Sequence, residues 1–118
     1  MTIARTVFAV FLAMLLPAAH ACDYPERADI PNGGSATKEQ MLEGQRSVKA
    51  FMAAMEEYLD CIEAEEARTI ESMPDISEEE RANRQAALTK KHNAAVDDME
   101  LVAARFNEAV RAYKAQGE

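Results

Sequence analysis

Two long stretches of helical pattern, separated by a short break at Pro74, limit what this chain can fold into. In the first stretch, over residues 37–72, large apolar side chains recur at spacings of three, four and seven residues, which places them on one face of a helix. They belong to Met41, Val48, Phe51, Met52, Met55, Tyr58, Leu59 and Ile62. Ala, Met, Glu and Gln are common and β-branched residues sparse, so composition also favours a helix.

Capping and stop signals mark the ends of this first helix. Thr37, followed three residues later by Gln40, matches a capping box. Pro74 cannot continue a helix, because it lacks the amide hydrogen and restricts the residue before it. Gly44 is the one unfavourable residue inside, at a cost of about 1 kcal/mol relative to Ala.

The second stretch predicts a helix that returns along the first. Ser77 and Glu80 match a second capping box, and Gly117 ends the pattern. Its apolar face is formed by Leu88, His92, Ala95, Met99, Val102, Phe106, Val110 and Tyr113. Spacings that alternate between three and four residues predict a shallow left-handed crossing of the two helices.

The short connection between the helices fixes their orientation. Because only a few residues separate them, the helices must be antiparallel neighbours. Pairing outward from the turn gives Ile62–Leu88, Leu59–His92, Met55–Ala95, Met52–Met99, Val48–Val102 and Met41 near Phe106. The expected fold is therefore all-α, a long antiparallel two-helix hairpin over about 37–72 and 78–116.

Residues 1–21 have the pattern of a signal peptide. Arg5 supplies the positive charge, and residues 7–16 form an apolar run that suits a signal peptide and is too short to cross a bilayer. The tripeptide Ala-His-Ala at 19–21 matches the small-x-small rule for cleavage. The alternative, a retained membrane anchor, is disfavoured by the short run. We expect an exported, periplasmic or secreted bacterial protein whose mature chain begins at Cys22.

The chain has two cysteines, Cys22 and Cys61. In an exported protein, such a pair indicates one disulfide. The first helix covers about 36 Å from Thr37 to Cys61, and residues 22–37 span about 50 Å when extended. Residues 22–36 are therefore expected to form an extended strap along the first helix, followed by the helical domain over 37–118. In the chain-entropy model, closing this loop contributes about 4 kcal/mol.

The strap has the residues that an extended segment and a turn require. Pro25 and Pro31 favour extended backbone, and Tyr24 and Ile30 are its apolar anchors. The sequence Pro-Asn-Gly-Gly at 31–34 supplies the turn that leads into the helix.

A cysteine directly after the cleavage site is also the position that carries the lipid in bacterial lipoproteins. Their motif usually has Leu three residues before the cysteine, where this chain has Ala19. An outer-membrane lipoprotein anchored through Cys22 is thus the alternative to the disulfide, and two free thiols are a third possibility.

Acidic residues are concentrated around the expected turn. They are Glu56, Glu57, Asp60, Glu63, Glu65, Glu66, Glu71, Asp75, Glu78, Glu79 and Glu80. Arg68 is the only base between Glu56 and Glu80, and the rest of the mature chain is close to neutral. Nucleic acid and anionic lipid headgroups are therefore disfavoured as partners, because binding them depends on Lys and Arg.

Glu56, Asp60 and Glu63 share one helix face and make the one candidate cation site. The plainer interpretation is a solvated acidic face whose repulsion is offset by Lys90 and Lys91, which the antiparallel register brings level with Asp60. The other is a divalent-cation site or a dock for a basic partner. No EF-hand spacing is present in the sequence.

His92 is the single histidine after residue 21 and lies on the apolar face opposite Leu59. A packed histidine is the plain interpretation. As a metal ligand beside Asp60 or Glu63 it lacks the second nitrogen or sulfur that zinc sites usually have. No nucleophile stands in the context of a catalytic triad, and Cys61 is not in a Cys-x-x-Cys motif. We therefore expect neither an enzyme nor a cofactor.

Several short sequence segments in the expected mature chain are similar to segments of other exported proteins. They are Pro31-Asn32-Gly33, Ala36-Thr37, Gln45 with Val48-Lys49, Tyr58-Leu59 with Cys61, Lys91-His92-Asn93-Ala94-Ala95-Val96-Asp97, and Phe106-Asn107 with Val110. With these phrases the chain resembles a group of short, exported, uncharacterised proteobacterial helical proteins. The resemblance implies an exported helical protein without an established activity. It also directs attention to Asn93 and Asn107.

Two functions are consistent with these observations. A two-helix hairpin leaves an apolar flank that two helices cannot hide, which favours non-enzymatic binding or scaffolding of another envelope protein. The strap or a homodimer would cover that flank, and the sequence leaves both open. The alternative is an acidic divalent-cation-binding protein that uses the turn end, with Glu56, Asp60, Glu63 and His92 as candidate ligands.

Overall fold

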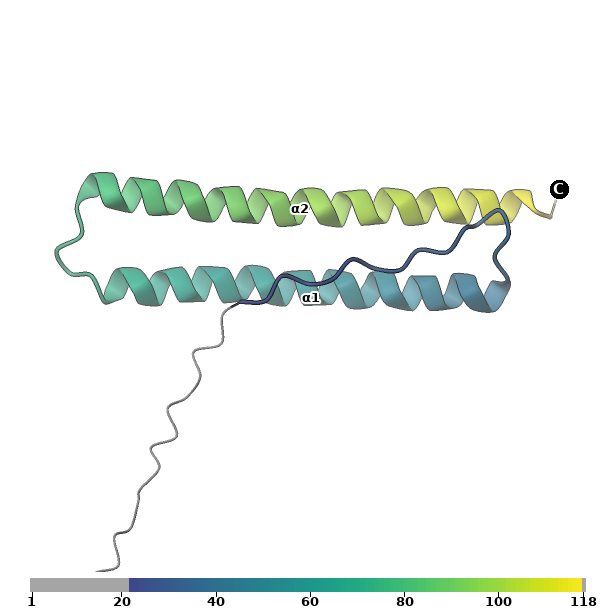
Figure 1. Ribbon diagram of the computed structural model, residues 1–118, viewed down its shortest axis with the longest axis horizontal. Coiled ribbons are helices and arrows are strands. Elements are labelled where there is room, and N and C mark those ends of the chain that lie inside the picture. The colour runs from purple at the N-terminus through teal and green to yellow at the C-terminus, as the bar shows by residue number, and fades with distance from the viewer. Residues whose placement is uncertain (1–21, 118) are drawn as a thin grey trace, which may run out of the picture.

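A computed structural model describes residues 22–117, so the expected signal peptide, residues 1–21, lies outside the described part. Within this part, helix α1 (Lys38–Glu71) and helix α2 (Glu78–Ala115) lie antiparallel, and no strand is present (Figure 1). The all-α hairpin is confirmed, with boundaries close to the predicted ones.

One of the two predicted capping boxes is complete and the other is half formed. The Thr37 hydroxyl accepts from the Gln40 amide at 3.2 Å, and the Gln40 side chain accepts from the Thr37 amide at 2.8 Å. In α2, the Ser77 hydroxyl accepts from the Glu80 amide at 3.1 Å. The Glu80 carboxylate, however, lies 3.9 Å from Arg84 and does not return to the Ser77 amide. An ion pair one turn along the helix replaces the second half of the box.

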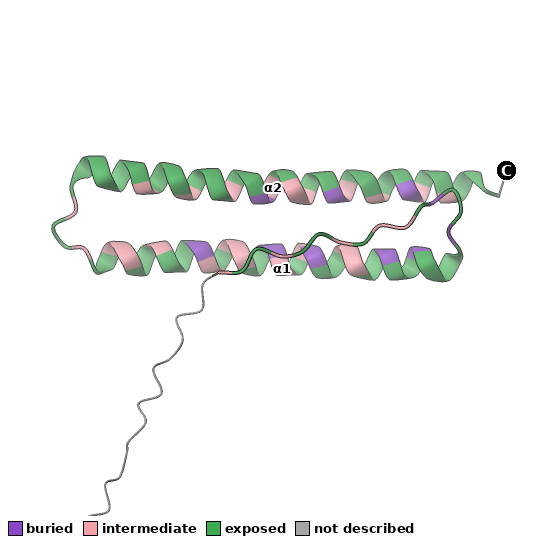
Figure 2. Cartoon of the chain, in the orientation of Figure 1, coloured by how far each residue is buried: buried purple, intermediate pink, exposed green. Residues whose placement is uncertain are grey.

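The core is a thin double row of side chains between the two helices, seen as the purple bands in Figure 2. Met55 and Ala95 are both fully buried in the same cluster, together with Phe51 and Val102. A second cluster near the open end of the hairpin contains Ala36, Met41 and Ala109, with Phe106 packed against it. The large Met55 and the small Ala95, which were predicted to face each other, therefore lie in the same buried cluster.

The strap, residues 22–36, lies over the groove between the helices and contacts both of them. It starts beside the middle of α1 and crosses to the C-terminal end of α2 before it enters α1 (Figure 1). The Asp29 amide donates to the Ser47 hydroxyl of α1 at 3.0 Å, whereas Gly33 lies against the backbone of Ala109 in α2. The sequence predicted a strap along the first helix, and the structure shows that the strap also contacts α2. The crossing allows Ile30 to pack against both core clusters.

The predicted turn at the end of the strap is present and is tied to α2. The Asn32 side chain accepts from the Gly34 amide at 3.0 Å, the local bond that makes Asn common in turns. The Gln116 side-chain amide, at the end of α2, donates to the carbonyl oxygens of Gly33 and Ala36. These bonds hold the start of α1 against the end of α2.

Two glycines are required by close packing of the strap. A Cβ on Gly44 would lie 2.5 Å from Pro31 Cδ, so the glycine in α1 makes room for the proline ring. A Cβ on Gly33 would lie 1.8 Å from the Ala109 carbonyl oxygen. The helix-propensity cost of Gly44 is therefore offset by contact with the strap.

The predicted disulfide between Cys22 and Cys61 is present, with Cα atoms 5.7 Å apart. The same sulfur cannot also carry a thioether-linked lipid, so the lipoprotein alternative through Cys22 is wrong for this structure. A helical hairpin with a disulfide is consistent with an oxidising compartment outside the cytoplasm.

We expect Cys22→Ser and Cys61→Ser each to lower the free energy of unfolding by about 4 kcal/mol, because both open the same loop. Urea denaturation followed by circular dichroism measures the loss. Dithiothreitol should destabilise the wild type by a similar amount and leave both variants unchanged. Equal stability of oxidised and reduced wild type would contradict this account.

We expect Gly44→Ala to destabilise the protein by about 1–3 kcal/mol, since overpacking against Pro31 outweighs a propensity gain of about 1 kcal/mol. In a Pro31→Ala background, the obstructing ring is gone, and the same change at Gly44 should be stabilising. Urea denaturation of the four proteins of this double-mutant cycle measures the coupling. Additive effects would show that the two residues do not meet.

Candidate functional site

The four candidate cation ligands do not come together. Glu56, Asp60 and Glu63 are exposed on α1, and His92 is half-buried on α2. Among residues 22–117, no group of three or more His, Cys, Asp or Glu side chains is placed to hold a metal ion. The structure therefore provides no preformed cation site at these positions.

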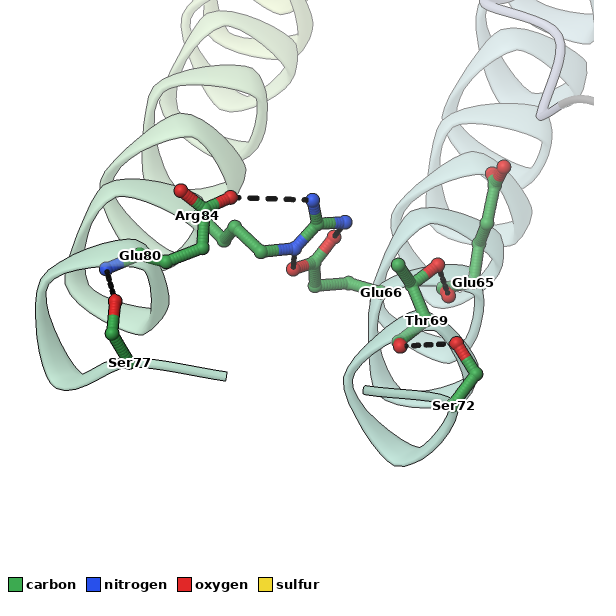
Figure 3. A network of polar contacts seen from close by, with 7 residues as sticks. All are labelled: Glu65, Glu66, Thr69, Ser72, Ser77, Glu80 and Arg84. Atoms are coloured by element: carbon green, nitrogen blue, oxygen red, sulfur yellow. Dashed lines mark hydrogen bonds and ion pairs between the residues drawn. The ribbon is translucent and has the colours of Figure 1, made fainter. Parts of the chain in front are cut away.

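The helices are joined near the turn by an ion pair that sequence analysis did not foresee. Arg84 Nε donates to Glu66 Oε1 at 2.8 Å, and its Nη2 donates to Glu66 Oε2 at 3.1 Å (Figure 3). Lys90 and Lys91, which were expected to offset the repulsion at Asp60, take part in no ion pair among the described residues. The planar guanidinium group reaches across the hairpin and binds the carboxylate with two hydrogen bonds, a geometry that the lysine ammonium lacks.

The remaining polar contacts at this end satisfy the backbone of the helix terminus. The Thr69 hydroxyl donates to the Glu65 carbonyl oxygen at 2.9 Å, and the Ser72 hydroxyl donates to the Thr69 carbonyl oxygen at 2.7 Å (Figure 3). The last carbonyl groups of a helix have no partner within the helix itself. The Ser72 hydroxyl therefore satisfies one of these terminal carbonyl groups, whereas the Thr69 hydroxyl bonds a carbonyl one turn earlier that also accepts a bond within the helix.

The strap is latched to α2 through Asp98. Arg27 forms an ion pair with Asp98 at 2.5 Å, and the Tyr24 hydroxyl donates to Asp98 at 3.1 Å. The Asp98 side chain is only 11% exposed. The Tyr24 ring meets Tyr58 of α1 edge-on, with centroids 5.0 Å apart. Sequence analysis found the Tyr24 anchor but missed Asp98, whose partner is 71 positions away along the chain.

The latch changes the acidity of Asp98. The hydrogen bond from the Arg27 guanidinium lowers the pKa of Asp98 and outweighs burial, which acts in the opposite direction; the Tyr24 hydrogen bond adds to the lowering. A carboxyl group with a lowered pKa in the folded state stabilises that state above its unfolded-state pKa. This contribution is lost as the pH falls through the folded-state pKa.

We expect Asp98→Asn to be less stable than the wild type at pH 7. The difference should shrink as the pH falls below about 4, because the wild-type carboxylate then takes up a proton. Urea denaturation across this pH range measures it. Asp97→Asn, which removes the same charge next to the latch, is the control and should keep the wild-type profile. If the free energies of unfolding of the wild type and Asp98→Asn changed with pH in the same way, the proposed stabilisation by Asp98 would be contradicted.

The two faces of the hairpin differ. The positions that hold the strap, Ser47 and Cys61 on α1 and Asp98 on α2, lie to one side of the buried rows. At about 100° per residue, eight of the half-buried apolar positions fall on the other side, whereas Ala54 and Tyr58 lie beside the strap. This uncovered seam consists of Val48, Met52 and Leu59 of α1 and Val96, Met99, Ala103, Phe106 and Val110 of α2. The strap lies on the opposite face, and the connection over residues 72–77 lies at one end of the hairpin (Figure 1).

The side chains of this hairpin are suited to burying apolar surface against another molecule. No polar or charged side chain among the described residues is buried. The large apolar side chains that are clearly exposed are Tyr24, Leu42 and Leu101, which lie apart in the sequence. The continuous apolar feature is therefore the seam, which can bury further surface only against another helix or protein.

The structure thus defines a two-helix hairpin closed on one face by a disulfide-bonded strap. No helix in the described part of the chain is long and apolar enough to cross a membrane. Comparison with protein-family models, curated proteins and solved structures found no match.

Proposed function

We propose that this chain is a non-enzymatic binding protein of the bacterial cell envelope, which holds another protein against the uncovered seam. The observation that carries the proposal is the difference between the two faces. One is covered by the strap, and the other presents eight half-buried apolar side chains in a row. A row of this kind on two long helices suits a partner that contributes helices of its own.

The latched strap supports this function by keeping the seam rigid. The strap is fixed to α1 by the disulfide, to α2 by Asp98 and again to the end of α2 by Gln116. A surface that is ordered before binding loses less conformational entropy when the partner docks. The strap therefore prepares the opposite face without occupying it.

The periplasm is the compartment that best suits this protein. A disulfide is stable under oxidising conditions, and residues 1–21 have the pattern of a signal peptide. The resemblance to short exported proteobacterial proteins points to the same compartment. The acidic turn end favours partners without a strongly negative surface.

We expect an apolar fluorescent dye to bind the folded protein at the seam. Changing Val96 and Ala103 together to Gln should lower the dye fluorescence, because both are half-buried in the seam and lie outside the side chains that pack on the core clusters. Fluorescence titration of the folded proteins measures the effect.

The matched control changes Leu101 and Ala104 of the same helix to Gln. Both are exposed, and Leu101 lies on the strap side beside Arg27. This double variant should keep the wild-type fluorescence, although Leu101 is more exposed than either seam residue. Equal losses in both double variants, or no dye binding to the wild type, would remove the support for a binding seam.

A further inference from the structure

We infer that the partner on the uncovered seam is a second copy of this chain, packed seam to seam about a two-fold axis that crosses α1 near Met52 and Ala53. This inference rests on the proposed function, because it takes the seam as the docking surface. It adds the identity of the partner and the register of the contact.

The charges along the rim of the seam on α1 carry the argument. Lys38, Lys49, Glu56 and Glu63 follow one another at intervals of eleven, seven and seven residues, which keeps them on one helix face, and they lie beside Met52 on the side away from the strap. All four side chains are exposed, and none takes part in an ion pair within the described part of the chain. The rim is therefore basic at the start of α1 and acidic toward the turn.

When two copies of this rim run antiparallel, the basic part of one copy faces the acidic part of the other. In an antiparallel pairing, Lys49 of each copy faces Glu56 of the other, which gives two ion pairs per dimer. A parallel pairing would set Lys49 against Lys49 and Glu56 against Glu56. The axis falls halfway between the two charges, at the level of the half-buried Met52 of the seam.

The same axis gives a compatible contact on α2. Met52 and Met99 pack against one core cluster, so the axis crosses α2 near Met99. The exposed positions beside the seam on α2 are then paired so that Thr89 of one copy faces Asn107 of the other. These side chains are neutral and can exchange hydrogen bonds. The rims on α1 thus meet as opposite charges and those on α2 as neutral groups at Thr89 and Asn107, whereas the exposed Glu100 lies close to the axis and to Glu100 of the other copy.

The packing leaves the strap undisturbed. The two seams meet in the middle of a four-helix arrangement, which is a common way for helical hairpins to bury apolar rows. The straps and both disulfides lie on the two outer faces. A different seam-to-seam packing, with α1 of one copy on α2 of the other, would set Lys49 against the exposed Glu100.

Charge reversal tests both the partner and the register. Sedimentation equilibrium at low salt should show that the wild type is a dimer. Lys49→Glu and Glu56→Lys should each raise the dimer dissociation constant by about tenfold, because each sets two pairs of like charges against each other. The double variant, Lys49→Glu with Glu56→Lys, should return close to the wild-type constant, since both ion pairs are formed again with exchanged signs.

Two variants that make the same charge changes away from the rim are the controls. Glu57→Lys is next to Glu56 but points away from the seam, and Lys90→Glu is exposed on α2. Both should keep the wild-type dissociation constant. Far-ultraviolet circular dichroism should show equal helix content in every variant, because each changed residue is exposed.

Three results would overturn the inference. The first is a wild type that stays monomeric, and the second is a double variant that dimerises as weakly as the single variants. The third is that Glu100→Lys, and not Glu56→Lys, restores dimerisation of Lys49→Glu. A monomer that still binds dye at the seam would refute self-association alone and leave the proposed function standing. A monomer that binds no dye would refute both.

Discussion

The disulfide between Cys22 and Cys61 is the constraint on which the rest of this structure depends. Two helices bury only a thin double row of side chains, and a strap held by a few weak contacts would leave its groove easily. A covalent bond at one end and the Gln116 hydrogen bonds at the other keep the strap over both core clusters. The contact with Asp98 then forms between groups that are already held close together.

This arrangement gives the hairpin two different faces, and that difference links the fold to the proposed function. On the strap side, Pro31 fits into the space left by Gly44, and Gly33 lies against the α2 backbone. The other face keeps its half-buried row from Val48 to Val110. In the dimer that we propose, a hairpin with one covered face is half of a four-helix arrangement, and Lys49 of one copy faces Glu56 of the other.

Much of this fold was predictable because it depends on local pattern. The spacing of apolar residues predicted both helices, Thr37 and Gln40 predicted the first cap, and two cysteines after an expected signal peptide predicted the disulfide. Asp98 was missed because nothing in its neighbourhood along the chain marks it as the partner of Arg27. The Arg84–Glu66 pair was missed because several lysines and arginines in α2 are near enough in register to face the acidic turn.

The amino-acid sequence by itself determined the helical periodicity, the antiparallel order imposed by a short connection, and the acidic turn end. These follow from interactions among residues close together along the chain. Tertiary structure alone decided that the strap crosses to α2, that Gly44 is a packing residue and that one face stays uncovered. Those outcomes depend on where side chains distant in sequence meet, and the available space is fixed only when both helices and the strap are in place.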